Sequence, residues 1–281
     1  MAVAMLILPA GDAISKALMS FAGPFEVTLW RSVANGMLFG PVAILARRRL
    51  GGPPVSGAAV FSGLLLITIS FLLISAFQRM PIATAIAIFF VEPLLLTLLA
   101  GPFLGEVPGP RRLVAVGVGL IGALIVIRPN FQIFGPVALM PALAALAYAA
   151  NMIVLRRASM RQSALSLQIG ATLTAALLAA LAALTAALSG RGGPSYFLAP
   201  VWVQLAVPAA AILFAAAFLL ITFAFSRCEA STLAPLQYLE IVGATLVGLI
   251  FFGSLPDAWT WIGTAIILGS GLYILHRDRR A

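Results

Sequence analysis

Long apolar stretches alternate with short polar connections along the whole chain. A bilayer core of about 30 Å needs ~20 apolar residues per helix, and the stretches have that length. They lack the alternating pattern of ~10-residue strands in an outer-membrane barrel. The pattern predicts an all-α membrane protein with ten transmembrane helices, at about residues 3–22, 26–46, 57–77, 81–101, 111–128, 133–155, 164–188, 201–225, 229–251 and 257–275.

The composition agrees with a lipid environment. Of the 281 residues, 62% are hydrophobic and 9% are charged, whereas soluble domains carry roughly a quarter charged residues. The chain has one cysteine, Cys228, and one histidine, His276, which excludes an intrachain disulfide and a cluster of Cys and His ligands. We therefore expect no metal and no other cofactor.

The basic residues indicate the orientation of the chain. With the N-terminus in the cytoplasm, the inner connections and the C-terminal tail hold twelve arginines and the outer connections hold three. This bias predicts a multi-pass protein of the bacterial inner membrane with both termini in the cytoplasm. It also explains the net charge of +9 through topology and contact with lipid headgroups, so we expect no nucleic-acid partner.

One segment of the chain occurs twice. Residues 72–129 align without a gap with residues 220–277. The identical polar pairs are Arg79 with Arg227, Thr84 with Thr232, Glu92 with Glu240, and Thr97 with Thr245. Such self-similarity predicts a duplication into two five-helix repeats, residues 1–130 and 131–281. Because five is odd, the second repeat enters the membrane inverted, and inverted repeats are typical of transporters.

Short motifs in the first repeat resemble the EamA-type repeat of the drug/metabolite transporter superfamily. They are Val91-Glu92-Pro93, Leu104-Gly105-Glu106, the glycines Gly117, Gly119 and Gly122 before Arg128-Pro129, and Trp30-Arg31. The second repeat departs from the motif, since Glu240 lacks a following proline and Ser254 replaces a glutamate. The resemblance implies a carrier of small organic metabolites. Among such carriers, the layout is most similar to bacterial amino-acid exporters, including the aromatic amino-acid exporters of the YddG type.

Ionisable groups inside a span normally face the bundle interior or a water-filled cavity, because lipid penalises them by several kcal/mol. Glu92 and Glu240 fall near the midplane of their spans, in equivalent positions of the two repeats. Two interpretations stay open for them. They either contact a substrate ammonium or carry a coupled proton, or they are protonated side chains that fix helix packing. Pro93 and Pro235 each predict a kink close to one of these glutamates.

Further polar and aromatic residues are candidates for the transport path. Asp12 and Lys16 lie four apart on one face of the first span, which predicts a self-neutralising pair or a pair that separates as the halves move. Arg31 either snorkels to the outer surface or lines an outer vestibule that attracts a substrate carboxylate. Trp30, Phe89, Phe90, Tyr148, Asn151, Gln237 and Tyr238 are candidates for the wall of the path, and each also suits simple packing.

These observations predict a monomeric carrier that exports amino acids or similar solutes by alternating access, with its site between the two repeats. Export of other metabolites or drugs, such as nucleosides or sugars, stays open as an alternative. A non-transporting bundle and an intramembrane enzyme are further alternatives. The chain contains no DxxD, HExxH or GxSxG motif, which argues against an enzyme. Coupling to protons also stays open.

Overall fold

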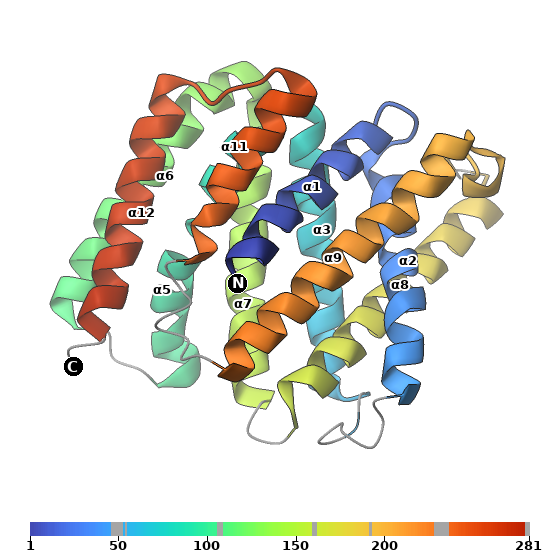
Figure 1. Ribbon diagram of the computed structural model, residues 1–281. Coiled ribbons are helices and arrows are strands. Elements are labelled where there is room, and N and C mark those ends of the chain that lie inside the picture. The colour runs from blue at the N-terminus through green and yellow to red at the C-terminus, as the bar shows by residue number, and fades with distance from the viewer. Residues whose placement is uncertain are drawn as a thin grey trace.

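The computed structural model of the 281-residue chain describes residues 1–45, 53, 55–105, 109–158, 162–190, 193–227 and 236–278. Within these residues the secondary structure is entirely helical (Figure 1). The α-helices are α1 (Ala2–Leu18), α2 (Pro24–Leu45), α3 (Gly57–Arg79), α4 (Ile82–Phe89), α5 (Glu92–Leu104), α6 (Pro110–Phe134), α7 (Met140–Ala158), α8 (Ala164–Leu188), α9 (Val201–Arg227), α11 (Leu239–Phe252) and α12 (Ala258–Asp278), and two short 3-10 helices are η1 (Gly135–Leu139) and η2 (Tyr196–Leu198).

Five helical segments in the described part of the chain are long and apolar enough to cross a membrane. They are Gly57–Arg79, Ile82–Leu104, Asn130–Ala158, Leu165–Leu188 and Val201–Ile221. Shorter apolar helices cover Leu113–Ile127 and Leu239–Phe252. The protein is therefore a multi-pass membrane protein, as the apolar pattern predicts.

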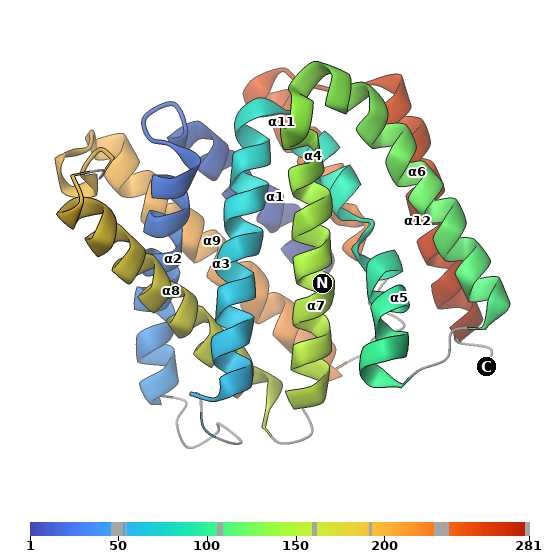
Figure 2. The same ribbon diagram turned by 180° about the vertical axis from the view of Figure 1, so that it is seen from behind.

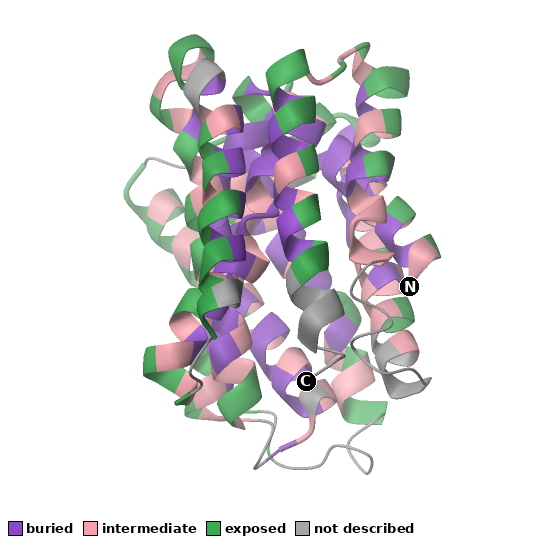
Figure 3. Ribbon diagram, turned by 90° about the vertical axis from the view of Figure 1, so that its left-hand side faces the viewer, coloured by how far each residue is buried: buried purple, intermediate pink, exposed green. Residues whose placement is uncertain are grey.

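Whether a side chain is buried or exposed depends on its position in the bundle and not on its polarity alone. Buried residues concentrate on the inner faces of the helices, and exposed residues lie on the outside (Figure 3). Many exposed residues are large and apolar, including Leu45, Leu188 and Phe251. Acyl chains can cover such surface in a bilayer. The most enclosed helix is α4, in which every residue from Ile82 to Ile88 is buried.

The helices pack in a few extensive pairs. Helix α6 packs on α12, α2 on α8, α3 on α7, and α1 on both α9 and α11. The α6–α12 pair stands at one side of the bundle and the α2–α8 pair at the other (Figures 1 and 2). Glycines allow α6 and α12 to approach closely, because a Cβ on Gly263 would lie only 2.6 Å from the carbonyl oxygen of Gly122.

Helix boundaries differ from several of the predicted spans. Helix α1 ends at Leu18, before the predicted end at residue 22, and α6 continues past the predicted end at residue 128 to Phe134. The predicted span 81–101 is divided into α4 and α5. Pro93 explains the division, since it has no N–H to donate to the carbonyl of Phe89, and this interrupts the hydrogen-bond ladder of the helix.

Candidate functional site

Glu92 and Glu240 both lie in the first turn of a helix that begins inside the chain's apolar regions. Helix α5 begins at Glu92, directly after the break that follows α4, and α11 begins at Leu239. The positive end of a helix dipole stabilises negative charge at this position. Among the described residues, neither glutamate has an ion-pair partner. Pro235, predicted to kink the chain before Glu240, lies outside the described residues.

Two aromatic pairs accompany these glutamates. The ring centroids of Phe89 and Tyr148 are 5.6 Å apart in an edge-to-face arrangement, and those of Phe90 and Tyr238 are 5.5 Å apart. Tyr148, on α7, lies close enough to interact electrostatically with both Glu92 and Glu240. Tyr238 lies within the same range of Glu92. We call the group the central cluster; its members are Phe89, Phe90, Glu92, Tyr148, Tyr238 and Glu240.

The central cluster is not sealed in the protein interior. Phe90 is 7% exposed, but the other five members are only partly buried and keep accessible surface. Carboxyl groups that are neither paired with a cation nor fully enclosed can accept contacts from a bound molecule. The cluster therefore combines two acidic groups with several aromatic rings at the level of the helix breaks.

Asp12 forms an ion pair with Arg31. The Arg31 Nη1 donates to Asp12 Oδ1 over 3.1 Å and to Ser15 Oγ over 3.2 Å. The two charged side chains are only 10% and 12% exposed, and the guanidinium carbon lies 4.7 Å from the centroid of the Phe214 ring on α9. Asp12 is also within electrostatic range of Glu240.

The predicted pairing of Asp12 with Lys16 is wrong, because Asp12 pairs with Arg31. Of the two interpretations of Arg31, the structure excludes the one in which its side chain snorkels to the surface. The physical reason is that α1 and α2 both pack on α9, and the long Arg31 side chain of α2 reaches Asp12 of α1 directly. Its planar, multidentate guanidinium suits a buried carboxylate better than a compact, strongly hydrated ammonium does.

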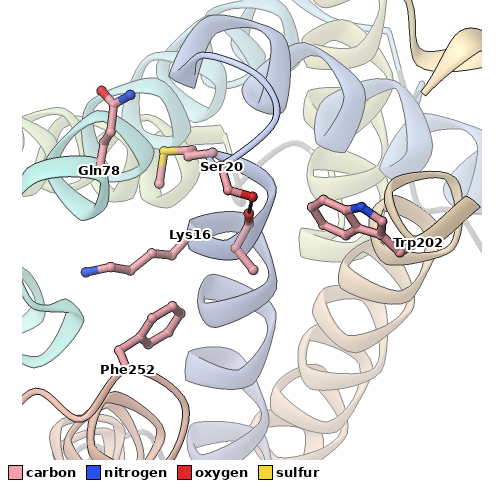
Figure 4. Close-up of a pocket in the computed structure, with 7 residues that line it drawn as sticks. Lys16, Ser20, Gln78, Trp202 and Phe252 are labelled. Carbon is pink, nitrogen blue, oxygen red and sulfur yellow. Dashed lines mark hydrogen bonds between the residues drawn. The ribbon is translucent and has the colours of Figure 1, made fainter. Parts of the chain in front are cut away.

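Lys16 turns instead toward the end of the bundle at which α1 ends. Its Nζ donates to the carbonyl oxygen of Met80 over 2.8 Å and lies 5.2 Å from the centroid of the Phe252 ring. Figure 4 shows the extended Lys16 side chain between Gln78 and Phe252. These residues and Trp202 line a pocket of about 490 Å³. We call it the upper pocket, because the ends of α1 and α11 that line it lie toward the top of Figure 1.

The other predicted wall residues lie apart from the central cluster or beside it. The Trp30 ring packs against Tyr196, at 5.7 Å between centroids, in a separate apolar cluster. Asn151 Oδ1 accepts a hydrogen bond of 2.6 Å from Ser62 Oγ, which joins α7 to α3. Gln237 is half-buried next to Tyr238. Trp30 and Asn151 thus make packing contacts that the sequence also allowed.

Some contacts of the site could not be read from the sequence. Phe214 and Phe252 each cover a cation, but they are two of 18 phenylalanines in an apolar chain, and no motif distinguishes them. Ser15 is equally inconspicuous. The described residues contain no group of three or more His, Cys, Asp or Glu side chains arranged to hold a metal ion.

Comparison with known proteins gives consistent similarities. Residues 1–128 match the EamA-like transporter family. The chain is 31% identical over 208 residues to a riboflavin transporter of Rhizobium johnstonii, which covers 74% of this chain and 66% of that protein. It is 28% identical over 273 residues to an S-adenosylmethionine uptake transporter of Rickettsia conorii, with 97% and 90% of the two chains covered.

A solved structure shares the fold. It is described only as the crystal structure of a protein, and it superposes with a TM-score of 0.62 over 99% of this chain and 96% of that chain. The two sequences are 23% identical.

Proposed function

The chain belongs to the EamA-like transporter family, and from this premise we propose that it carries a positively charged solute with a flat ring system through the central cluster. As a member of that family it is a transporter and not an enzyme. The observation that supports the solute class is the grouping of Glu92 and Glu240, which lack a cationic partner among the described residues, with Tyr148 and Tyr238.

Each part of the central cluster suits one part of such a solute. Two carboxyl groups near the same tyrosine attract a cation, and in a site of low polarity this attraction is stronger than in water. The faces of aromatic rings attract cations and also stack on flat ring systems. A solute with both features satisfies the carboxyl groups and covers the rings at the same time.

The solutes named for the relatives fit this chemistry to different degrees. S-adenosylmethionine, transported by the Rickettsia conorii relative, carries a sulfonium cation and an adenine ring. Riboflavin, transported by the Rhizobium johnstonii relative, has a flat three-ring system but no positive charge. We therefore favour an S-adenosylmethionine-like solute, with a riboflavin-like solute as the second candidate on the strength of the aromatic pairs.

The direction of transport that we propose is uptake. The relative that covers 97% of this chain is named as an uptake transporter, whereas the expected export of amino acids finds no support among the relatives. The arginine distribution of the sequence supports an inner-membrane location with both termini in the cytoplasm. A pathway within one chain requires no second copy, so we propose that the monomer is functional.

We further propose that the chain folds as ten transmembrane helices in two inverted repeats, residues 1–130 and 131–281. The packing supports this arrangement, because a contact between two helices recurs between the two corresponding helices of the other repeat. The α1–α9 contact corresponds to α7–α3, α1–α11 to α7–α5, and α2–α9 to α8–α3. All six contacts are present.

Local geometry at matched positions supports the same arrangement. Thr97 Oγ1 donates to the Pro93 carbonyl over 2.9 Å, and Thr245 Oγ1 donates to the Ile241 carbonyl over 2.8 Å. Helices α5 and α11 both end in a left-handed glycine, Gly105 with φ 72° and Gly253 with φ 59°. Two halves that share one backbone arrangement can move against each other, so that the transport path opens first to one side of the membrane and then to the other.

Uptake into liposomes tests the proposed solute. The purified protein is reconstituted, and the entry of labelled S-adenosylmethionine, riboflavin and tryptophan is measured. We expect S-adenosylmethionine to enter fastest, and unlabelled S-adenosylmethionine to compete with its own entry. The double variant Glu92→Gln/Glu240→Gln should abolish this uptake.

A matched control is Glu26→Gln, a change of the same kind at the beginning of α2, outside the central cluster. It should transport at the rate of the unchanged protein. The proposal fails if S-adenosylmethionine does not enter, or if the double variant takes it up as fast as the Glu26→Gln control.

A further inference from the structure

The upper pocket lies apart from the central cluster and has its own chemistry. The ends of four helices line it, with Lys16 from the end of α1 and Ser20 from the turn that follows, Gln78 from α3, Trp202 from α9 and Phe252 from α11. Its volume of about 490 Å³ falls in the usual range for small-molecule sites, about 300–1,000 Å³. The pocket therefore has room for a solute of the proposed size.

The charge of Lys16 is available to a ligand. An ammonium group has three donors, and the structure assigns one of them to the Met80 carbonyl. Asp12, one helical turn away, is paired with Arg31, so that Lys16 has no carboxylate partner among the described residues. A half-buried cation without a counter-charge is costly in a membrane, and a carboxylate bound in the pocket would remove that cost.

The remaining walls suit an amphipathic ligand. Ser20 donates its hydroxyl hydrogen to the Ala17 carbonyl, which leaves the Ser20 oxygen as an acceptor, and the exposed Gln78 amide offers both donors and an acceptor. Trp202 and Phe252 add aromatic faces (Figure 4). The pocket thus presents a cation and polar groups for a charged end, and apolar rings for the rest of the molecule.

A solute in the upper pocket is too far from the central cluster to contact both. Phe252 lies twelve residues beyond Glu240 on α11, which corresponds to ~18 Å along a helix. We propose that the upper pocket is a separate binding site for the carboxylate group of the transported solute, held by Lys16, and that the solute occupies it before reaching the central cluster. This inference rests on the proposed function, and it adds that the solute carries a carboxylate as well as a cation.

Protection from alkylation tests the site independently of transport. Ala17 is exposed and borders the pocket, and Cys228 is the single cysteine of the chain. In the double variant Ala17→Cys/Cys228→Ser, the rate of reaction with a membrane-impermeant thiol reagent is measured in liposomes. The added probes are S-adenosylmethionine, methionine and tryptophan, each paired with its analogue that lacks the carboxylate.

We expect at least one carboxylate probe to slow the reaction several-fold, and its analogue to have little effect. Adding Lys16→Gln should remove the difference within the pair, whereas Lys16→Arg should retain it. A charged hydrogen bond contributes about 1.5–3 kcal/mol, which corresponds to about a tenfold or larger rise in the half-protecting concentration.

Two results would overturn the inference. One is that no carboxylate probe protects better than its analogue when Lys16 is present. The other is that Lys16→Gln leaves the protection unchanged. Both are distinguishable from failure of the proposed function, which is decided by uptake in the Glu92→Gln/Glu240→Gln variant and needs no protection of the upper pocket.

Discussion

The two helix breaks place matched glutamates in different surroundings. At the first break, Glu92 follows two phenylalanines and lies near Tyr148 of α7, the helix that packs on α5. At the second, Glu240 follows Tyr238 and lies within electrostatic range of Asp12 on α1, the helix that packs on α11. One neighbouring helix therefore brings an aromatic ring, and the other brings one half of a buried ion pair.

This difference shows how two regions with the same local backbone features can form an asymmetric site. The backbone features that the two regions share are a carboxyl in the first helical turn and a left-handed glycine at the helix end. The surrounding side chains differ in part: Tyr148 lies near both glutamates, whereas Asp12 lies near Glu240. A solute bound between the two breaks would therefore meet different side chains on its two sides, which suits a molecule with a flat end and a charged end.

The largest expected effect comes from breaking the ion pair. Arg31→Met leaves the buried Asp12 carboxylate without a counter-charge, and such a loss costs about 3–5 kcal/mol. The midpoint of thermal unfolding of the purified protein should fall markedly, and Asp12→Asn/Arg31→Met should recover part of the loss. Arg79→Met, at an exposed position, is the control and should unfold like the unchanged protein. Equal midpoints for Arg31→Met and the control would contradict the pairing.

The next effect separates the two glutamates. Glu92→Gln removes the carboxyl that interacts with both tyrosines, and loss of a charged contact worth about 1.5–3 kcal/mol raises the half-saturating concentration of S-adenosylmethionine about tenfold or more. Glu240→Gln should have a smaller effect, because Glu240 interacts with only one of the two tyrosines, Tyr148. Initial uptake rates at several concentrations measure both. A larger effect for Glu240→Gln than for Glu92→Gln would contradict this order.

A smaller effect concerns the rings. Stacking of a base on an aromatic side chain contributes about 1–3 kcal/mol, so Tyr148→Leu should weaken uptake of S-adenosylmethionine and riboflavin about tenfold. Tyr148→Phe keeps the ring and should retain most of the activity. Trp30→Phe, in a separate cluster, serves as an aromatic control. If Tyr148→Leu transports both solutes normally, the ring does not contact them.

The smallest effect tests what the two regions share. Gly105 and Gly253 have positive φ and nothing within 4 Å of an added Cβ, so each change to alanine costs roughly 1 kcal/mol through the backbone alone. The two losses in unfolding free energy should be equal within error. Gly40→Ala, also without a close contact but inside a helix, should not destabilise. Clearly unequal losses of unfolding free energy at the two glycines would argue against a backbone arrangement shared by the two repeats.

Local rules of the backbone made much of the fold predictable. The apolar stretches coincide with helices, and Pro93 correctly marked the break between α4 and α5. Boundaries were less certain where the helix continues through a connection, as it does in α6 to Phe134. The candidate residues of the central cluster were also identifiable, since acidic and aromatic side chains are conspicuous in an apolar span. Their grouping into one cluster depends on how α7 and α11 pack, which local sequence patterns do not specify.

The sequence by itself determined the helical character of this protein, the membrane as its surroundings and the positions of Glu92 and Glu240. These depend on apolar length and on residues close together in the chain. Only the tertiary structure decided which charges meet. Asp12 has Lys16 one turn away and Arg31 19 residues away. The tertiary arrangement, in which α1 and α2 both pack on α9, selects Arg31, because a buried carboxylate takes the partner that can reach it with several hydrogen-bond donors. Because Asp12 pairs with Arg31, the Lys16 side chain lines the upper pocket instead.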